Sequence, residues 1–166
     1  INYMPSIDKV RSISVWIFVI PFIAVNTCLI IITQFHEFLS PGIPINPTFP
    51  YLDGEVSISR TVRNYPMNLI FKPAMFLTSF LLIRYWLNTK NIINHFEENH
   101  EHIKKIIFFG IGSAVLLILH SIFLGIKIDN DLYKFFRRVV MLSFIIFELV
   151  AQAYLINFLY KSKDKI

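Results

Sequence analysis

Four polar side chains interrupt stretches of the sequence that are otherwise apolar: Asn26, Lys72, His120 and Glu148. Carboxyl, imidazole and ammonium groups can exchange protons, bind a phosphate or form hydrogen bonds between helices. At a helical rise of about 1.5 Å per residue, and measured from one end of each stretch, Lys72 lies ~8 Å deep, His120 ~9 Å, and Asn26 and Glu148 ~14 Å. The four groups should therefore meet at similar depth, with His120 and Lys72 as partners of Glu148.

The surroundings of His120 and Glu148 favour a non-catalytic role, because the sequence offers no nucleophile, metal triad or oxyanion arrangement near them. A haem held by two histidines needs a second buried histidine, so no cofactor is expected. The single cysteine, Cys28, allows neither an intrachain disulfide nor a Cys-x-x-Cys redox pair. At helical spacing three histidines among glutamates do not converge on one ion, so no metal site is expected. These histidines are His95, His100 and His102.

The elements that must position these groups are four long apolar segments, at about 13–35, 67–86, 106–126 and 139–160. Each approaches the ~20 residues that cross a bilayer as a helix. Hydrophobic residues make up 55% of the chain and the mean hydropathy is +0.57. Because lipid cannot satisfy backbone polar groups, the spans must be helical. The sequence therefore predicts an all-α, integral membrane four-helix bundle, with residues 1–166 as a single transmembrane domain.

The first connection is rich in proline, with Pro41, Pro44, Pro47 and Pro50 spaced three apart. That spacing matches the three-residue turn of polyproline II and predicts a stiff, extended strap.

Two local patterns predict how the spans end and pack. Arg84, Tyr85 and Trp86 are typical of an aromatic and basic belt at the membrane surface. The small residues at 110 and 112–114 should let a neighbouring helix approach closely.

The net charge of +5 reflects Lys and Arg near span ends, where they contact anionic head groups rather than nucleic acid. With four spans, nine of the 16 cations lie on the side of the termini and seven on the other side. The positive-inside rule then places both termini in the cytosol or the mitochondrial matrix. An endomembrane and the mitochondrial inner membrane both fit this orientation.

A polar pocket for a lipid head group is one prediction from these residues. Arg60 and Arg63 follow the first connection among hydroxyl side chains, and guanidinium groups bind phosphate oxygens in a forked geometry. The candidate head-group residues are Arg60, Arg63, Lys72, His120 and Glu148. Asn26 and Gln152 are expected to be buried polar groups that hold helices together, and hydrogen bonding between helices is the alternative role for the whole set.

The order of features resembles the membrane family of DRAM autophagy modulators and post-GPI-attachment lipid-remodelling proteins. The resemblance covers Arg11 to Tyr160, and Tyr133 stands where that family has a histidine. It is carried by Pro21, Phe35-His36, Pro47, Pro50, Tyr51, Ser57-Ile58-Ser59, Pro66, Arg84-Tyr85-Trp86, the segment 110–124 and Asp129-Asn130. The resemblance implies a lipid-associated membrane protein that binds, senses or remodels lipid, with membrane lipids as partners.

A second class of function fits the same sequence. Small size, the proline strap and 17 Phe residues suit a non-catalytic accessory subunit of a larger membrane complex, whose partners are other membrane subunits.

Overall fold

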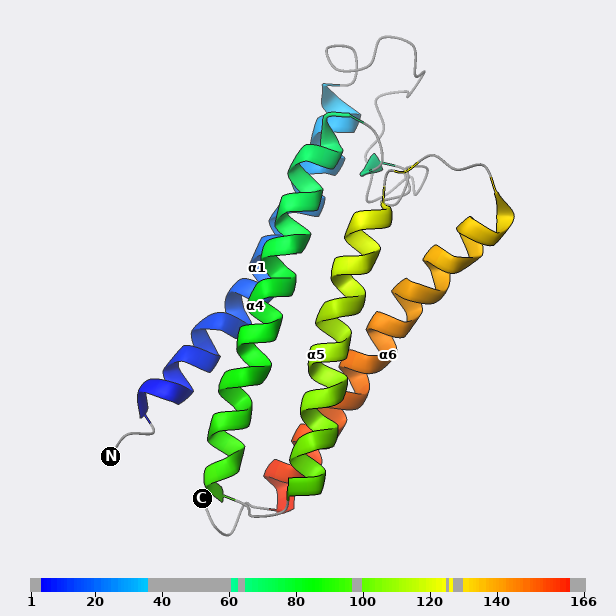
Figure 1. Ribbon diagram of the computed structural model, residues 1–166. Coiled ribbons are helices and arrows are strands. Elements are labelled where there is room, and N and C mark those ends of the chain that lie inside the picture. The colour runs from blue at the N-terminus through cyan, green and yellow to red at the C-terminus, as the bar shows by residue number, and fades with distance from the viewer. Residues whose placement is uncertain are drawn as a thin grey trace.

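The computed structural model describes residues 4–35, 61–62, 65–96, 100–124, 126 and 130–161. This part of the chain forms four helices: α1 Met4–Gln34, α4 Met67–Phe96, α5 His100–Phe123 and α6 Asp131–Lys161 (Figure 1). All four are long and apolar enough to cross a membrane. The predicted all-α four-helix membrane bundle is confirmed. The proline-rich connection lies outside the described residues.

The helices extend beyond the predicted spans. α4 continues ten residues past Trp86, and α6 begins eight residues before the predicted start at 139. Residues 87–96 and 131–138 contain neither glycine nor proline, so nothing in them interrupts the helical hydrogen bonds. Hydropathy marks the part of a helix that lipid surrounds, and the backbone stays helical well past it.

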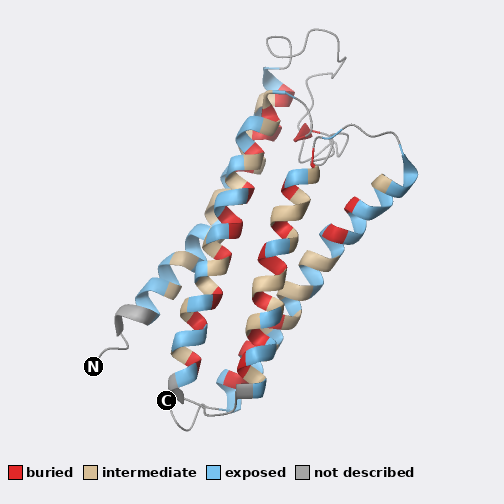
Figure 2. Ribbon diagram, viewed as in Figure 1, coloured by how far each residue is buried: buried red, intermediate tan, exposed pale blue. Residues whose placement is uncertain are grey.

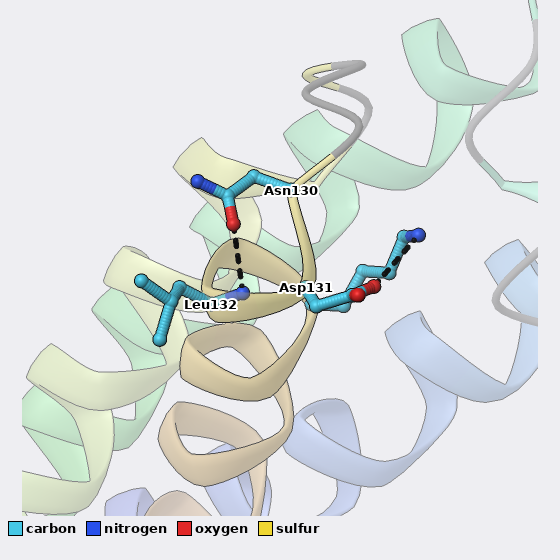
Figure 3. Close-up of polar contacts among 4 residues, drawn as sticks. Asn130, Asp131 and Leu132 are labelled. Atoms are coloured by element: carbon cyan, nitrogen blue, oxygen red, sulfur yellow. Dashed lines mark hydrogen bonds and ion pairs between the residues drawn. The ribbon is translucent and has the colours of Figure 1, made fainter.

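Local contacts define the junction between α5 and α6. The Leu132 N–H donates to Asn130 Oδ1 at 3.0 Å, so Asn130 caps the start of α6 (Figure 3). Asp131 lies in the first turn, where a negative charge is favourable, and pairs with Lys134 at 3.2 Å. On the other side of the junction, the Tyr133 hydroxyl donates to the Phe123 carbonyl at 2.6 Å. A carbonyl that the last turn of α5 leaves without a helical partner is thereby satisfied.

Helices adjacent in the chain pack against each other, α4 on α1, α5 on α4 and α6 on α5. The start of α1 and the end of α6 lie at the same end of the bundle (Figure 1). We call this end the terminus side; it also contains the end of α4 and the start of α5. The opposite end, with the end of α1 and the start of α6, is the loop side.

Two hydrophobic clusters form the interior. One joins α4, α5 and α6 and includes Leu82, Trp86, Ile106, Ala114 and Ala151. The other joins α1, α4 and α5 and includes Cys28, Ile32, Phe71, Met75 and Leu117. Buried residues accordingly gather on α4 and α5, whereas most of α6 and the first half of α1 are exposed (Figure 2). The α4–α5 pair is the shared core of the bundle.

Four buried hydroxyls form hydrogen bonds within their own helices. Thr33, Thr78, Ser79 and Ser121 each donate at 2.8 Å to the carbonyl four residues earlier. These bonds remove the cost of placing a hydroxyl in an apolar interior.

α4 and α5 approach closely at Gly110, where the Trp86 indole lies directly against the glycine backbone. A Cβ on Gly110 would overlap Cδ2, Cγ and Cε2 of the ring. The neighbouring Gly112 has room, because a Cβ there would lie 3.9 Å from Phe147 Cδ1. The expected close approach at the small residues is therefore present, and Trp86 occupies it.

We expect Gly110→Ala to destabilise the protein by about 1–3 kcal/mol, because the methyl group overpacks the Trp86 contact. Gly112→Ala is the matched control and should change stability by less than about 1 kcal/mol, in the stabilising direction. The measurement is the free energy of unfolding in mixed micelles. Equal effects of the two substitutions would contradict the assignment of Gly110 as the contact point.

We expect Tyr133→Phe to lower the free energy of unfolding by about 1 kcal/mol, because it removes the hydrogen bond to the Phe123 carbonyl. Tyr160→Phe serves as the control, since Tyr160 is 79% exposed on the same helix. If the Tyr133 variant is as stable as the control, the hydroxyl is not a structural cap for α5.

Candidate functional site

A polar network centred on Glu148 joins three helices in the bundle interior. Ser113 Oγ of α5 lies 2.6 Å from Glu148 Oε2, and the Trp86 indole N–H of α4 donates to the same oxygen at 3.3 Å. Gln152, one turn further along α6, donates to Glu148 Oε1 at 2.9 Å. Both carboxyl oxygens of Glu148 therefore have hydrogen-bond partners. Tyr85 packs edge-on against Trp86, with ring centroids 5.1 Å apart.

The elements place these groups together for identifiable reasons. Gly110 lets the indole lie on α5, which brings its N–H next to Ser113, one turn further along that helix. Glu148 and Gln152 share a face of α6 at a spacing of four residues. Ala151, which is fully buried on α6, lets this helix pack closely at the level of the network.

The Ser113 hydroxyl faces two acceptors. Its Oγ lies 2.7 Å from the Gly110 carbonyl and 2.6 Å from Glu148 Oε2, and its single proton can be shared between them. Ser113 thereby links the backbone of α5 to the Glu148 side chain of α6. Donors from α4 and α5 offset the cost of placing a carboxyl group among apolar side chains.

The network lies near the middle of the bundle. Glu148 is 17 residues after the start of α6 at Asp131 and 13 residues before its end at Lys161. These intervals correspond to about 25 Å and about 20 Å.

The expected partners of Glu148 are not those that the structure shows. His120 is seven residues beyond Ser113 on α5, about 10 Å closer to the loop side. Lys72 is 14 residues before Trp86 on α4, about 21 Å away along the helix. Ser113 and Trp86 take their places as partners. Arg60 and Arg63 lie outside the described residues.

Other predicted polar groups have local partners. The Asn26 amide donates to the Phe22 carbonyl of its own helix at 2.6 Å. Gln152 bonds to Glu148 on the same helix.

A separate polar group lies near the loop side. Arg137 is buried, and its guanidinium carbon lies 5.9 Å from the centroid of the Tyr133 ring. Arg137 also acts electrostatically on the half-buried His120. His120 therefore lies near Arg137 of α6 on the loop side of the bundle, and not near Glu148.

Trp86, which the sequence predicts in an aromatic and basic belt, has a side chain that is 0% exposed and packs against Gly110 of α5. It faces the bundle interior and not the lipid. The signals that could have identified its role are the glycine at 110 and the glutamate in the fourth span. An indole N–H is a donor only, and it suits a buried acceptor.

The terminus side carries a second feature, a set of six exposed cations near the helix ends. We call them the terminus-side cations: Lys9, Arg11, Lys90, Lys104, Lys105 and Lys161. Within the described ranges none of the six is paired with a carboxylate. The described acids near the same ends are Asp8 and Glu101, so positive charge predominates.

In chemical terms, the central network joins three helices through hydrogen bonds to one carboxyl group. Among the residues that the structure describes, no group of three or more His, Cys, Asp or Glu side chains is arranged to hold a metal ion. The terminus-side cations can attract anions at the membrane surface.

No known protein-family model, curated protein or solved structure matches this chain. The resemblance to the DRAM and lipid-remodelling family therefore stays a prediction from the order of sequence features.

We expect Ser113→Ala and Glu148→Leu to be coupled in a double-mutant cycle by about 0.6–1.7 kcal/mol, the range for hydrogen bonds between membrane helices. Each substitution removes the same contact between α5 and α6. Unfolding free energies of the two single variants and the double variant give the coupling.

Ser121→Ala combined with Glu148→Leu is the matched control. Ser121 is also fully buried, but it donates to Leu117 of its own helix. This pair should be additive within about 0.5 kcal/mol. A coupling for Ser113 no larger than that for Ser121 would argue against a bond between helices.

Proposed function

We propose that this multi-pass membrane protein is lipid-associated and binds anionic phospholipids at its terminus side. The observation that carries the proposal is the set of terminus-side cations, which have no carboxylate partners in the described part of the chain. Each Lys or Arg near an anionic membrane surface contributes about 1 kcal/mol of attraction. Six such residues at one end of four spans favour enrichment of anionic lipid around that end.

Two further arguments support a lipid-related role. The exposed surface of the spans is apolar, with large side chains such as Phe18, Phe80, Phe108 and Ile146 facing outward on the four helices. The sequence resemblance to the DRAM and lipid-remodelling family also implies lipid handling. By the charge rule the terminus side faces the cytosol or the matrix, and cytoplasmic leaflets carry anionic lipids.

The cations proposed to contact head groups lie on the terminus side, whereas the sequence predicts a head-group pocket on the loop side. Glu148 is occupied by Ser113, Trp86 and Gln152 in the bundle interior. It is therefore assigned to helix packing and not to a head group. The terminus-side cations remain available, since they are exposed.

The test is lipid retention by the purified protein in mild detergent, with equal amounts of phosphatidylglycerol and phosphatidylcholine added. We expect phosphatidylglycerol to be enriched several-fold, and the enrichment to disappear in ~1 M salt, where the Debye length is about 3 Å. Extracted lipid is quantified by mass spectrometry.

The matched variants are Lys9→Gln with Arg11→Gln on the terminus side, and Lys134→Gln on the loop side. The first pair should reduce the enrichment and the second substitution should leave it unchanged. Equal retention of the two lipids by the unmodified protein would overturn the proposal. Recovery from the native membrane only within a larger assembly, without enriched lipid, would instead identify an accessory subunit.

A further inference from the structure

A groove of about 490 Å³ lies between α4 and α5 near the terminus side. Its volume is within the range of small-molecule sites, roughly 300–1,000 Å³. It is lined by Lys90 and Asn94 of α4 and by Ile103, Lys104, Ile107 and Phe108 of α5.

The contact between Trp86 and Gly110 gives the depth of each lining residue, because the two helices run antiparallel from that point. Lys90 and Asn94 lie four and eight residues beyond Trp86, about 6 Å and 12 Å nearer the surface. On α5, Lys104 and Phe108 precede Gly110 by six and two residues, about 9 Å and 3 Å. Asn94 and Lys104 therefore lie toward the outer end of the groove, beside Ile103, and the Phe108 ring is deepest.

The two lysines that line the groove, Lys90 and Lys104, favour an anionic ligand. Lys90 and Lys104 are exposed, and neither is paired with a carboxylate in the described part of the chain. Among the residues that the structure describes, no acidic side chain lines the groove. Two ammonium groups and one amide can donate several hydrogen bonds to phosphate oxygens.

The apolar lining of the groove suits a hydrocarbon chain. Ile103 is buried and forms part of the hydrophobic interior, and Ile107 packs against the same cluster. Phe108 is 67% exposed, and its ring contacts Phe109 and Phe147 at centroid distances of 5.5 Å and 6.2 Å. An exposed ring supported from behind provides a fixed surface for an acyl chain.

We infer that this groove binds one anionic phospholipid of the terminus-side leaflet. Lys90, Lys104 and Asn94 contact the phosphate and head group, and an acyl chain lies along Ile107 and Phe108. Free phosphate would leave the apolar lining unused, and a zwitterionic lipid would bring its own cation close to the two lysines. The inference rests on the proposed function and narrows it from a diffuse charged surface to one site.

The experiment uses the full chain in nanodiscs that contain equal phosphatidylglycerol and phosphatidylcholine. Protein is released in a mass spectrometer at increasing collision energy, and the fraction that retains one phosphatidylglycerol is measured. We expect a single tightly held phosphatidylglycerol on the unmodified protein. Lys90→Gln with Lys104→Gln should weaken its retention about 10- to 30-fold, from the known attraction per cation.

Lys105→Gln with Lys161→Gln is the matched control, because it removes the same charge from the same end outside the groove. It should leave the last lipid in place. Phe108→Ala should weaken retention of a long-chain phosphatidylglycerol but not that of a dihexanoyl form. All these residues are exposed, and an unchanged thermal unfolding curve establishes that each variant is folded.

The outcomes separate the site from the proposed function. If the two lysine pairs reduce retention equally, or if the groove variant keeps the last lipid, the groove is not the site while the lipid-associated function stands. If the unmodified protein shows no preference for phosphatidylglycerol, the proposed function itself fails.

Discussion

The contact between the Trp86 indole and the Gly110 backbone is the constraint on which the rest of the structure depends. It sets the register between α4 and α5 and brings the indole N–H to Glu148. The same register determines which side chains of the two helices lie at the membrane surface. Packing, hydrogen bonding and the lipid groove thus share one origin, a position where α5 has no side chain.

Around that contact, the bundle separates apolar and polar roles by depth. The α4–α5 pair provides the shared core, covered by α6 in one hydrophobic cluster and by α1 in the other. Charged side chains on the terminus side lie near the helix ends, where water and head groups solvate them. At the centre, Glu148 has donors from both neighbouring helices. An acid in hydrocarbon is tolerated because its hydrogen bonds are met inside the protein.

The fold could be predicted from sequence because an apolar segment in lipid must satisfy its backbone hydrogen bonds internally, as a helix does. Four apolar segments of this length therefore imply four helices. Helix ends could not be read from hydropathy, since residues 87–96 and 131–138 are polar enough to leave the hydrocarbon yet remain helical. The prediction chose His120 and Lys72 as partners of Glu148 because they are ionisable, whereas the structure has the Ser113 hydroxyl and the Trp86 indole N–H in that place. Gly110 indicated a close contact, but its partner depends on the register between helices, which local sequence patterns do not contain.

Chain order gives the central network a consequence for biosynthesis. Trp86 and Ser113 precede Glu148 in the sequence, so during synthesis from the N-terminus the helices that carry the donors emerge before α6. Glu148 therefore enters the bilayer when both donors are available. The last helix, α6, carries Glu148, which is the group that most needs hydrogen-bond partners. When α6 packs against α5, Glu148 meets Ser113 and Trp86 inside the bundle and is not left facing lipid.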